Sequence, residues 1–168
     1  MAWKKLDRHE LKRILIQNWM IHDGLWYNEV ASRFGMGEAS PMNVRICRKL
    51  GAIECARLMK MAGAPSPRNM VEYRELFELA ADVFVPEFQT VQVEYQSNDT
   101  QVFRTVECFA HKAMEKTGLL PDYECGIFVR IEGWFDAMGL KYTRTPDLSR
   151  CLKFKGQDCI ITVKFSFE

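Results

Sequence analysis

Residues 91–106 read VQVEYQSNDTQVFRTV, and this stretch decides the class of fold. The valines and the tyrosine of its first half alternate with polar residues, and a period of two predicts a half-buried strand. The Ser-Asn-Asp sequence at 97–99 is typical of a turn, and the alternation that resumes at 102–106 predicts the return strand. The chain is therefore expected to contain an antiparallel sheet.

Apolar residues upstream of this hairpin recur at helical spacing, which predicts four helices within residues 1–85. The first shows a capping box, in which Asp7 is followed by Glu10. The expected N-caps of the four helices are Asp7, Asp23, Ser40 and Ser66. Gly35 and Gly63 are the expected stops of the second and third helices.

Two helices and three strands are predicted after the hairpin. The helices end at Gly118 and Gly139, and the strands lie around 140–145, 150–155 and 159–167. The expected fold is a single α+β domain. Its helical half spans 1–85, and its α+β half, 86–168, holds an antiparallel sheet of about five strands with an inserted helical pair.

The dipeptide Gly156-Gln157 suits a two-residue turn that pairs the last two strands. This register places Leu152 opposite Ile161, so that Cys159 faces the core and Cys151 faces the other side of the sheet. Two thiols on opposite faces can neither form a disulfide nor share a metal ion.

Charge and composition exclude several classes of function. The 168 residues include 23 Lys and Arg against 22 Asp and Glu, which is not the charge balance of a nucleic-acid binder. No apolar run reaches the roughly 18 residues of a membrane span, and the charged start of the chain is unlike a signal peptide. We therefore expect a cytoplasmic protein with six reduced cysteines, and a homo-oligomer is left open. No phosphate loop, nucleophile elbow or dinucleotide fingerprint is present, so no cofactor is predicted.

The helix that begins near Cys108 has one polar side. Cys108, His111 and Glu115 share this side, opposite its apolar residues. A thiol and an imidazole at this spacing could form a nucleophile–base pair or part of a metal site, and the alternative is a solvated polar face.

Cys125 lies near the start of the next expected helix, where backbone N–H groups and the helix dipole favour a thiolate. Glu132 and Asp136 follow on the same side of that helix and could act as general acid or base. Packing of Cys125 as a small hydrophobic residue is the other interpretation.

The cluster at 22–27 has a structural and a functional interpretation. In the first, Asp23 caps a helix at a helix–helix junction. In the second, His22 lines a pocket, and Trp26 or Tyr27 stacks on a flat ligand.

Two family resemblances cover different parts of the chain. The residues His22 to Trp26, Phe34-Gly35, Asn43 and Leu50 to Lys60 resemble an uncharacterised prokaryotic family of similar length. The pattern Cys108, Cys125, Gly156 and Cys159 is similar to the group named after L-2-amino-thiazoline-4-carboxylate hydrolase. This second resemblance implies hydrolysis of a small cyclic amidine-like substrate. The end of the chain also resembles small-ligand sensor domains of the vinyl-reductase type.

The leading hypothesis is a hydrolase of a C–N bond in a small metabolite. Cys108 or Cys125 would be its nucleophile and His111 its base, with Glu132 or Asp136 as supporting acid. The first alternative is a non-enzymatic ligand-binding or sensor domain, in which His22, Trp26, Tyr27 and Cys159 would contact the ligand. The second alternative is a Cys/His metal site built from Cys108, His111 and Cys125, which Cys159 could complete.

Overall fold

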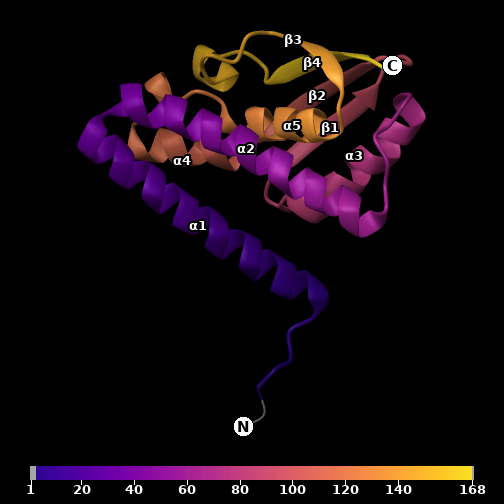
Figure 1. Ribbon diagram of the computed structural model, residues 1–168. Coiled ribbons are helices and arrows are strands. Elements are labelled where there is room, and N and C mark those ends of the chain that lie inside the picture. The colour runs from indigo at the N-terminus through magenta and orange to yellow at the C-terminus, as the bar shows by residue number, and fades with distance from the viewer. Residues whose placement is uncertain (1–2, 168) are drawn as a thin grey trace.

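The computed structural model describes residues 3–167, and Figure 1 shows their arrangement. Three long helices come first: α1 (Arg8–Phe34), α2 (Met36–Ala62) and α3 (Met70–Phe84). The second half contains β1 (Thr90–Tyr95), β2 (Thr100–Glu107), α4 (Phe109–Thr117), α5 (Gly126–Ala137), β3 (Lys141–Thr145) and β4 (Ile160–Ser166). Two short 3-10 helices, η1 (Leu120–Asp122) and η2 (Leu152–Lys155), lie in the connections. No helix within these residues has both the length and the apolar character that crossing a membrane requires.

The four strands form one antiparallel sheet in the order β1-β2-β4-β3. The α+β class, the β1–β2 hairpin and the helical pair inserted before β3 are as predicted. α3 and α5 cover one face of the sheet, where Tyr73 packs on Phe165 and Phe128 packs on Phe103. The other face carries exposed side chains such as Arg104 and Lys164. The main core therefore lies between this helix pair and the sheet.

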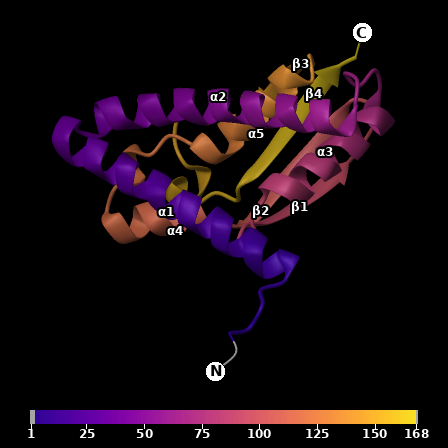
Figure 2. The same cartoon turned by 60° about the horizontal axis from the view of Figure 1, so that its bottom comes forward.

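α2 crosses the outer side of α5 and forms a further layer, as Figure 2 shows. The two helices approach so closely that a Cβ atom at Gly51 would lie 1.9 Å from the carbonyl oxygen of Arg130. α1 meets α2 at one end and diverges from it toward the other (Figure 2). Much of the apolar surface of α1 is exposed as a result, including Leu15 and Leu25.

The two helices predicted before Gly35 are a single helix, α1, so Asp23 is not an N-cap. The expected capping box of Asp7 and Glu10 does begin this helix. Gly24 lies inside the helix because a single glycine lowers helix stability by only about 1 kcal/mol, which is too little to end a long periodic segment.

The next two helices begin at other residues than predicted, and the N-terminal helices number three rather than four within residues 3–167. α2 starts at Met36 with Pro41 inside it, and the buried Ser40 hydroxyl accepts the Glu124 backbone N–H at 2.8 Å instead of capping. Asn69 rather than Ser66 caps α3.

The predicted strand at 150–155 is wrong, and the sheet has four strands rather than five. This segment is the 3-10 helix η2, which ends at Gly156 with a φ of 70°. β4 pairs instead with β2 and β3, and Ile161 faces Phe103 rather than Leu152. The expectation that Cys151 faces away from the core is also wrong. Its backbone N–H donates to the Tyr123 carbonyl, and its side chain is buried.

Candidate functional site

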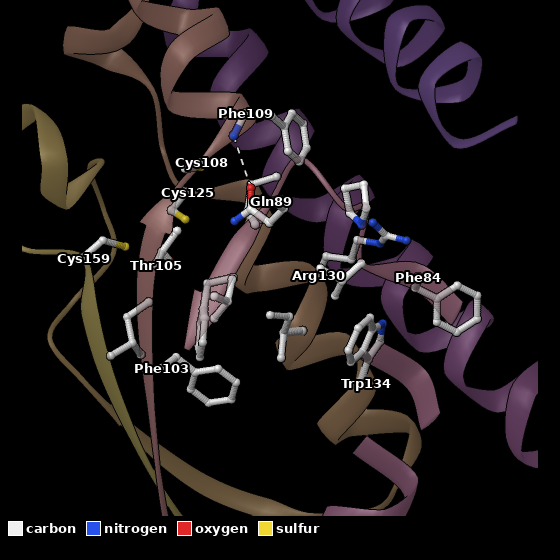
Figure 3. A pocket seen from close by; sticks show the side chains of 17 residues that line it. Phe84, Gln89, Phe103, Thr105, Cys108, Phe109, Cys125, Arg130, Trp134 and Cys159 are labelled. Atoms are coloured by element: carbon white, nitrogen blue, oxygen red, sulfur yellow. Dashed lines mark hydrogen bonds between the residues drawn. The ribbon is translucent and has the colours of Figure 1, made fainter. Parts of the chain in front are cut away.

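A partly open pocket of about 60 Å³ lies between α5, the β1–β2 hairpin and the connection that follows α3. We call it the thiol cavity, because three cysteines form one end of it (Figure 3). Most of its wall is apolar. Its aromatic residues are Phe84, Phe103, Phe109, Phe128 and Trp134. Several of these rings belong to the main core, so the fold holds the wall in place.

The three cysteines come from separate elements. Cys108 is the N-cap residue of α4, Cys125 is the N-cap residue of α5, and Cys159 directly precedes β4. In Figure 3 the sulfur atoms of Cys125 and Cys159 are both turned toward the cavity. The structure therefore brings together Cys108 and Cys125, the two alternative nucleophiles of the sequence prediction, and adds Cys159 to them.

Burial keeps these thiols protonated. It raises the pKa of Cys108, Cys125 and Cys159, and the negative charges that neighbouring cysteines would carry raise it further. Backbone N–H groups at the starts of α4 and α5 oppose this effect for Cys108 and Cys125, but they are outweighed. The helix start therefore does not produce the thiolate that the sequence predicted at Cys125.

Gln89 supplies the most unusual polar group in the wall. It is 8% exposed, and its Oε1 accepts the backbone N–H of Phe109 at 3.2 Å. Its Nε2 is buried without a hydrogen-bond partner. In Figure 3 this nitrogen is turned toward the side of the cavity where Cys125 and Thr105 lie.

Arg130 forms the opposite end of the cavity and is held by a buried carboxylate. Its Nε and a terminal nitrogen each donate to Glu54 at 2.7 Å, and Trp134 Nε1 donates to the same carboxylate at 2.6 Å. The Trp19 ring lies 5.2 Å from the Arg130 guanidinium carbon. The charge of Arg130 is thus neutralised by a neighbour from α2.

His111 is not part of the thiol cavity wall. Its Nδ1 lies 3.6 Å from Cys151 Sγ, so the structure places it against a thiol that was not predicted as its partner. Cys151 belongs to a second apolar cluster with Tyr27, Met114 and Tyr123. Among residues 3–167, no three His, Cys, Asp or Glu side chains are arranged to hold a metal ion.

Glu132 and Asp136 also lie away from the thiols. Glu132 accepts from Arg144 Nε at 2.6 Å, and Asp136 accepts two hydrogen bonds from Arg48 at 2.7 and 2.9 Å. These carboxylates tie α5 to α2 and β3. They are not positioned to protonate a ligand in the thiol cavity.

The predicted ligand contacts at 22–27 line other hollows. His22, Trp26 and Tyr27 border a groove of about 250 Å³ between α1 and α2, and Trp26 Nε1 donates to His22 Nε2 at 3.2 Å. Tyr27 also lines a second partly open pocket, of about 130 Å³, between α1, α2, α4 and α5. Cys159 alone of the four predicted contacts lines the thiol cavity.

Sequence reasoning missed Gln89, Arg130 and the pairing of His111 with Cys151. Gln89 lies in a connection without periodicity, and Arg130 resembles any charged residue on an amphipathic helix. A hint was available for Arg130, since it is the one cation of a largely apolar helix and would need a partner if buried.

Comparison with known proteins gives a family but no activity. Residues 4–140, from the start of α1 to the end of α5, match the model of DUF6125, a family of unknown function. No curated protein matches the chain. The predicted link to the thiazoline-carboxylate hydrolase group stays a prediction. Because the match covers most of its length, the chain belongs to the DUF6125 family.

Proposed function

We propose that the protein binds a small, mainly apolar molecule in the thiol cavity and serves as a binding or sensing module. One observation carries this proposal: aromatic side chains and protonated thiols from α4, α5 and the sheet converge on one hollow in the core. Pockets of this kind, with apolar walls and few polar groups, are the usual form of small-ligand sites.

The volume limits the size of the ligand. A water molecule needs about 10–15 Å³ of such space, so a cavity of about 60 Å³ has room for only a few heavy atoms. An apolar hollow has little affinity for water, which leaves it open to a small apolar molecule.

The composition of the wall supports binding over acyl or amidine hydrolysis at this position. No imidazole or carboxylate is among its lining residues within 3–167, and burial raises the pKa of the thiols there. A cysteine nucleophile needs a base or a lowered pKa to react near neutral pH.

Xenon is a suitable first probe, because it binds to dry apolar cavities. We expect xenon to shift the methyl NMR signals of Ile127 and Ile161, which line the cavity. Ile131→Phe fills the same cavity and should weaken xenon binding at least tenfold. The matched control is Ile53→Phe on the exposed side of α2, which should leave the binding within twofold.

The proposal would be contradicted if xenon did not shift the methyl signals of Ile127 and Ile161 in the wild-type protein. Equal xenon binding by the Ile131→Phe variant would contradict it as well, because the signal would then come from another hollow, such as the larger cavity near Tyr27.

A Cys/His hydrolase of a small C–N compound is the second candidate. The contact between His111 Nδ1 and Cys151 Sγ favours it, because an imidazole at 3.6 Å could serve as the base for that thiol. In this version Cys151 replaces Cys108 and Cys125 as nucleophile.

Alkylation by iodoacetamide at pH 7.5, followed peptide by peptide with mass spectrometry, tests this second candidate. We expect Cys151, which is 9% exposed, to react faster than Cys55, which is fully buried. We expect His111→Gln to slow the alkylation of Cys151 about tenfold. Unchanged alkylation of Cys151 in the variant would remove the Cys/His hydrolase from consideration.

A further inference from the structure

The thiol cavity differs from an ordinary packing defect in one feature, the amide nitrogen of Gln89, which has no hydrogen-bond partner. Four buried side-chain polar atoms within residues 3–167 have no hydrogen-bond partner, and of the residues that carry them Gln89 lines this cavity. Leaving a buried donor unsatisfied is unfavourable, because the group gives up its hydrogen bonds to water and gains none in return. Such a group inside an apolar cavity indicates a partner that arrives from outside.

The orientation of this amide is fixed by its neighbours. Gln89 Oε1 accepts the Phe109 N–H, and a flipped amide would place two donors against each other. The Gln89 backbone N–H also donates to the Pro86 carbonyl at 2.9 Å, which anchors the connection before β1. The amide N–H groups are therefore held toward the cavity before any ligand binds.

The other groups in the wall indicate a neutral ligand. Arg130 is the charged lining residue, and Glu54 already neutralises it through two hydrogen bonds. The thiols are protonated and therefore neutral, so they offer no counter-charge to an anion. A carboxylate or phosphate would enter without a counter-charge, and burial of an unpaired anion is strongly unfavourable.

We infer that Gln89 is a specificity-determining residue, and that the ligand is a small neutral carbonyl compound whose oxygen accepts a hydrogen bond from Gln89 Nε2. The alkyl part of the ligand lies against the aromatic wall around Phe103 and Trp134. This inference rests on the proposed function, since it names the class of molecule that the same cavity takes.

The test compares two probes of equal shape, 2-butanone and 2-methyl-1-butene, which differ in carrying C=O or C=CH₂. NMR titration gives the dissociation constant of each probe. In the wild type, 2-butanone should also shift the side-chain NH₂ signals of Gln89, and the alkene should not. Loss of one neutral hydrogen bond corresponds to about a tenfold change in affinity.

Two variants remove the donor in different ways. Gln89→Met keeps the length of the side chain and Gln89→Leu keeps its branched end, and neither carries an N–H that could donate to the ligand. Each should weaken 2-butanone about tenfold and leave 2-methyl-1-butene within twofold. Ile131→Val is the matched control, because it lines the cavity without a polar group and should affect both probes alike.

The outcomes separate the inference from the proposed function. If the alkene and xenon bind but the Gln89 variants treat both probes alike, the role of Gln89 is overturned and the apolar binding site stands. If neither the two probes nor xenon binds to the wild type, both proposals fail. A Gln89→Met variant that loses its fold, judged by its amide spectrum, leaves Gln89→Leu to decide.

Discussion

A Cβ atom at Gly51 would lie 1.9 Å from the carbonyl oxygen of Arg130, which makes α2 and α5 near neighbours along their backbones. Gly133 repeats the relationship from the other helix, where a Cβ atom would lie 2.2 Å from the Arg48 carbonyl oxygen. Because α5 forms one wall of the thiol cavity on its other side, the glycine contacts set the position of that wall.

Gly51→Ala should therefore destabilise the protein, since the added methyl group meets backbone that cannot rotate away. Overpacking of this kind lowers the free energy of unfolding by about 1–3 kcal/mol or more. Gly37→Ala on the same helix meets nothing within 4 Å and should be neutral or stabilising. Urea denaturation of the two variants measures both effects, and equal stability of the two variants would refute the close contact.

Glu54→Gln should be strongly destabilising, because it leaves the Arg130 guanidinium charged and largely buried without its counter-ion. The two side chains of this pair are 10% and 15% exposed. Removing one partner of a buried pair typically lowers stability by about 3–5 kcal/mol. Glu29→Gln breaks the exposed pair with Arg33 and should change stability by less than about 1 kcal/mol. Thermal and urea unfolding would show the contrast, and a mild effect at Glu54 would argue against a buried pair.

Gly24→Ala tests whether α1 is one helix. In a continuous helix the alanine has free space and should stabilise the protein by up to about 1 kcal/mol. Gly63→Ala, at a φ of 65°, should instead destabilise it by about 1–2 kcal/mol. Melting temperatures that fall for both variants would support the helix–helix junction that the sequence alone suggested.

Stability should fall at alkaline pH. Burial raises the pKa of Cys47 and of Cys55 from 9.0 to about 12, and the negative charge of Asp23 adds to the effect at Cys47. Above pH 9 these thiols ionise in the unfolded chain while they stay protonated in the folded one, so unfolding releases protons. Their contribution is complete below pH 9 and is lost as the pH rises toward 12.

The free energy of unfolding from urea titrations between pH 7 and 11 measures this loss, which is at most about 1.4 kcal/mol per pH unit for each thiol. Cys55→Ala should reduce the slope above pH 9, whatever its effect at pH 7. An unchanged slope in this variant would show that Cys55 does not contribute to the alkaline loss.

Local pattern was sufficient for the elements whose partners are close in sequence. The alternation around Val93 predicted the hairpin in which it faces Phe103, and Gly118 ends α4 in the left-handed conformation that a C-terminal glycine favours. The same reasoning failed at 150–155. There a turn beside Gly156 was preferred over a long-range pairing, and β4 instead reaches β2 across more than fifty residues.

The candidate site was predictable only in part for the same reason. Cys108 and Cys125 were recognisable because each begins a helix, but their convergence with Cys159 depends on the sheet order. Nothing in the local sequence places His111 beside Cys151 or leaves one Gln89 nitrogen without a partner. Such relationships arise from tertiary packing, which periodicity does not encode.

Phe109, Ile127 and Arg130 line both the thiol cavity and the larger cavity near Tyr27. The two chambers are thus separated by a shared partition of side chains. Trimming any of these side chains would widen both chambers at once and bring them toward one continuous channel. Passage of a ligand from one chamber to the other is accordingly controlled by the three side chains that line both.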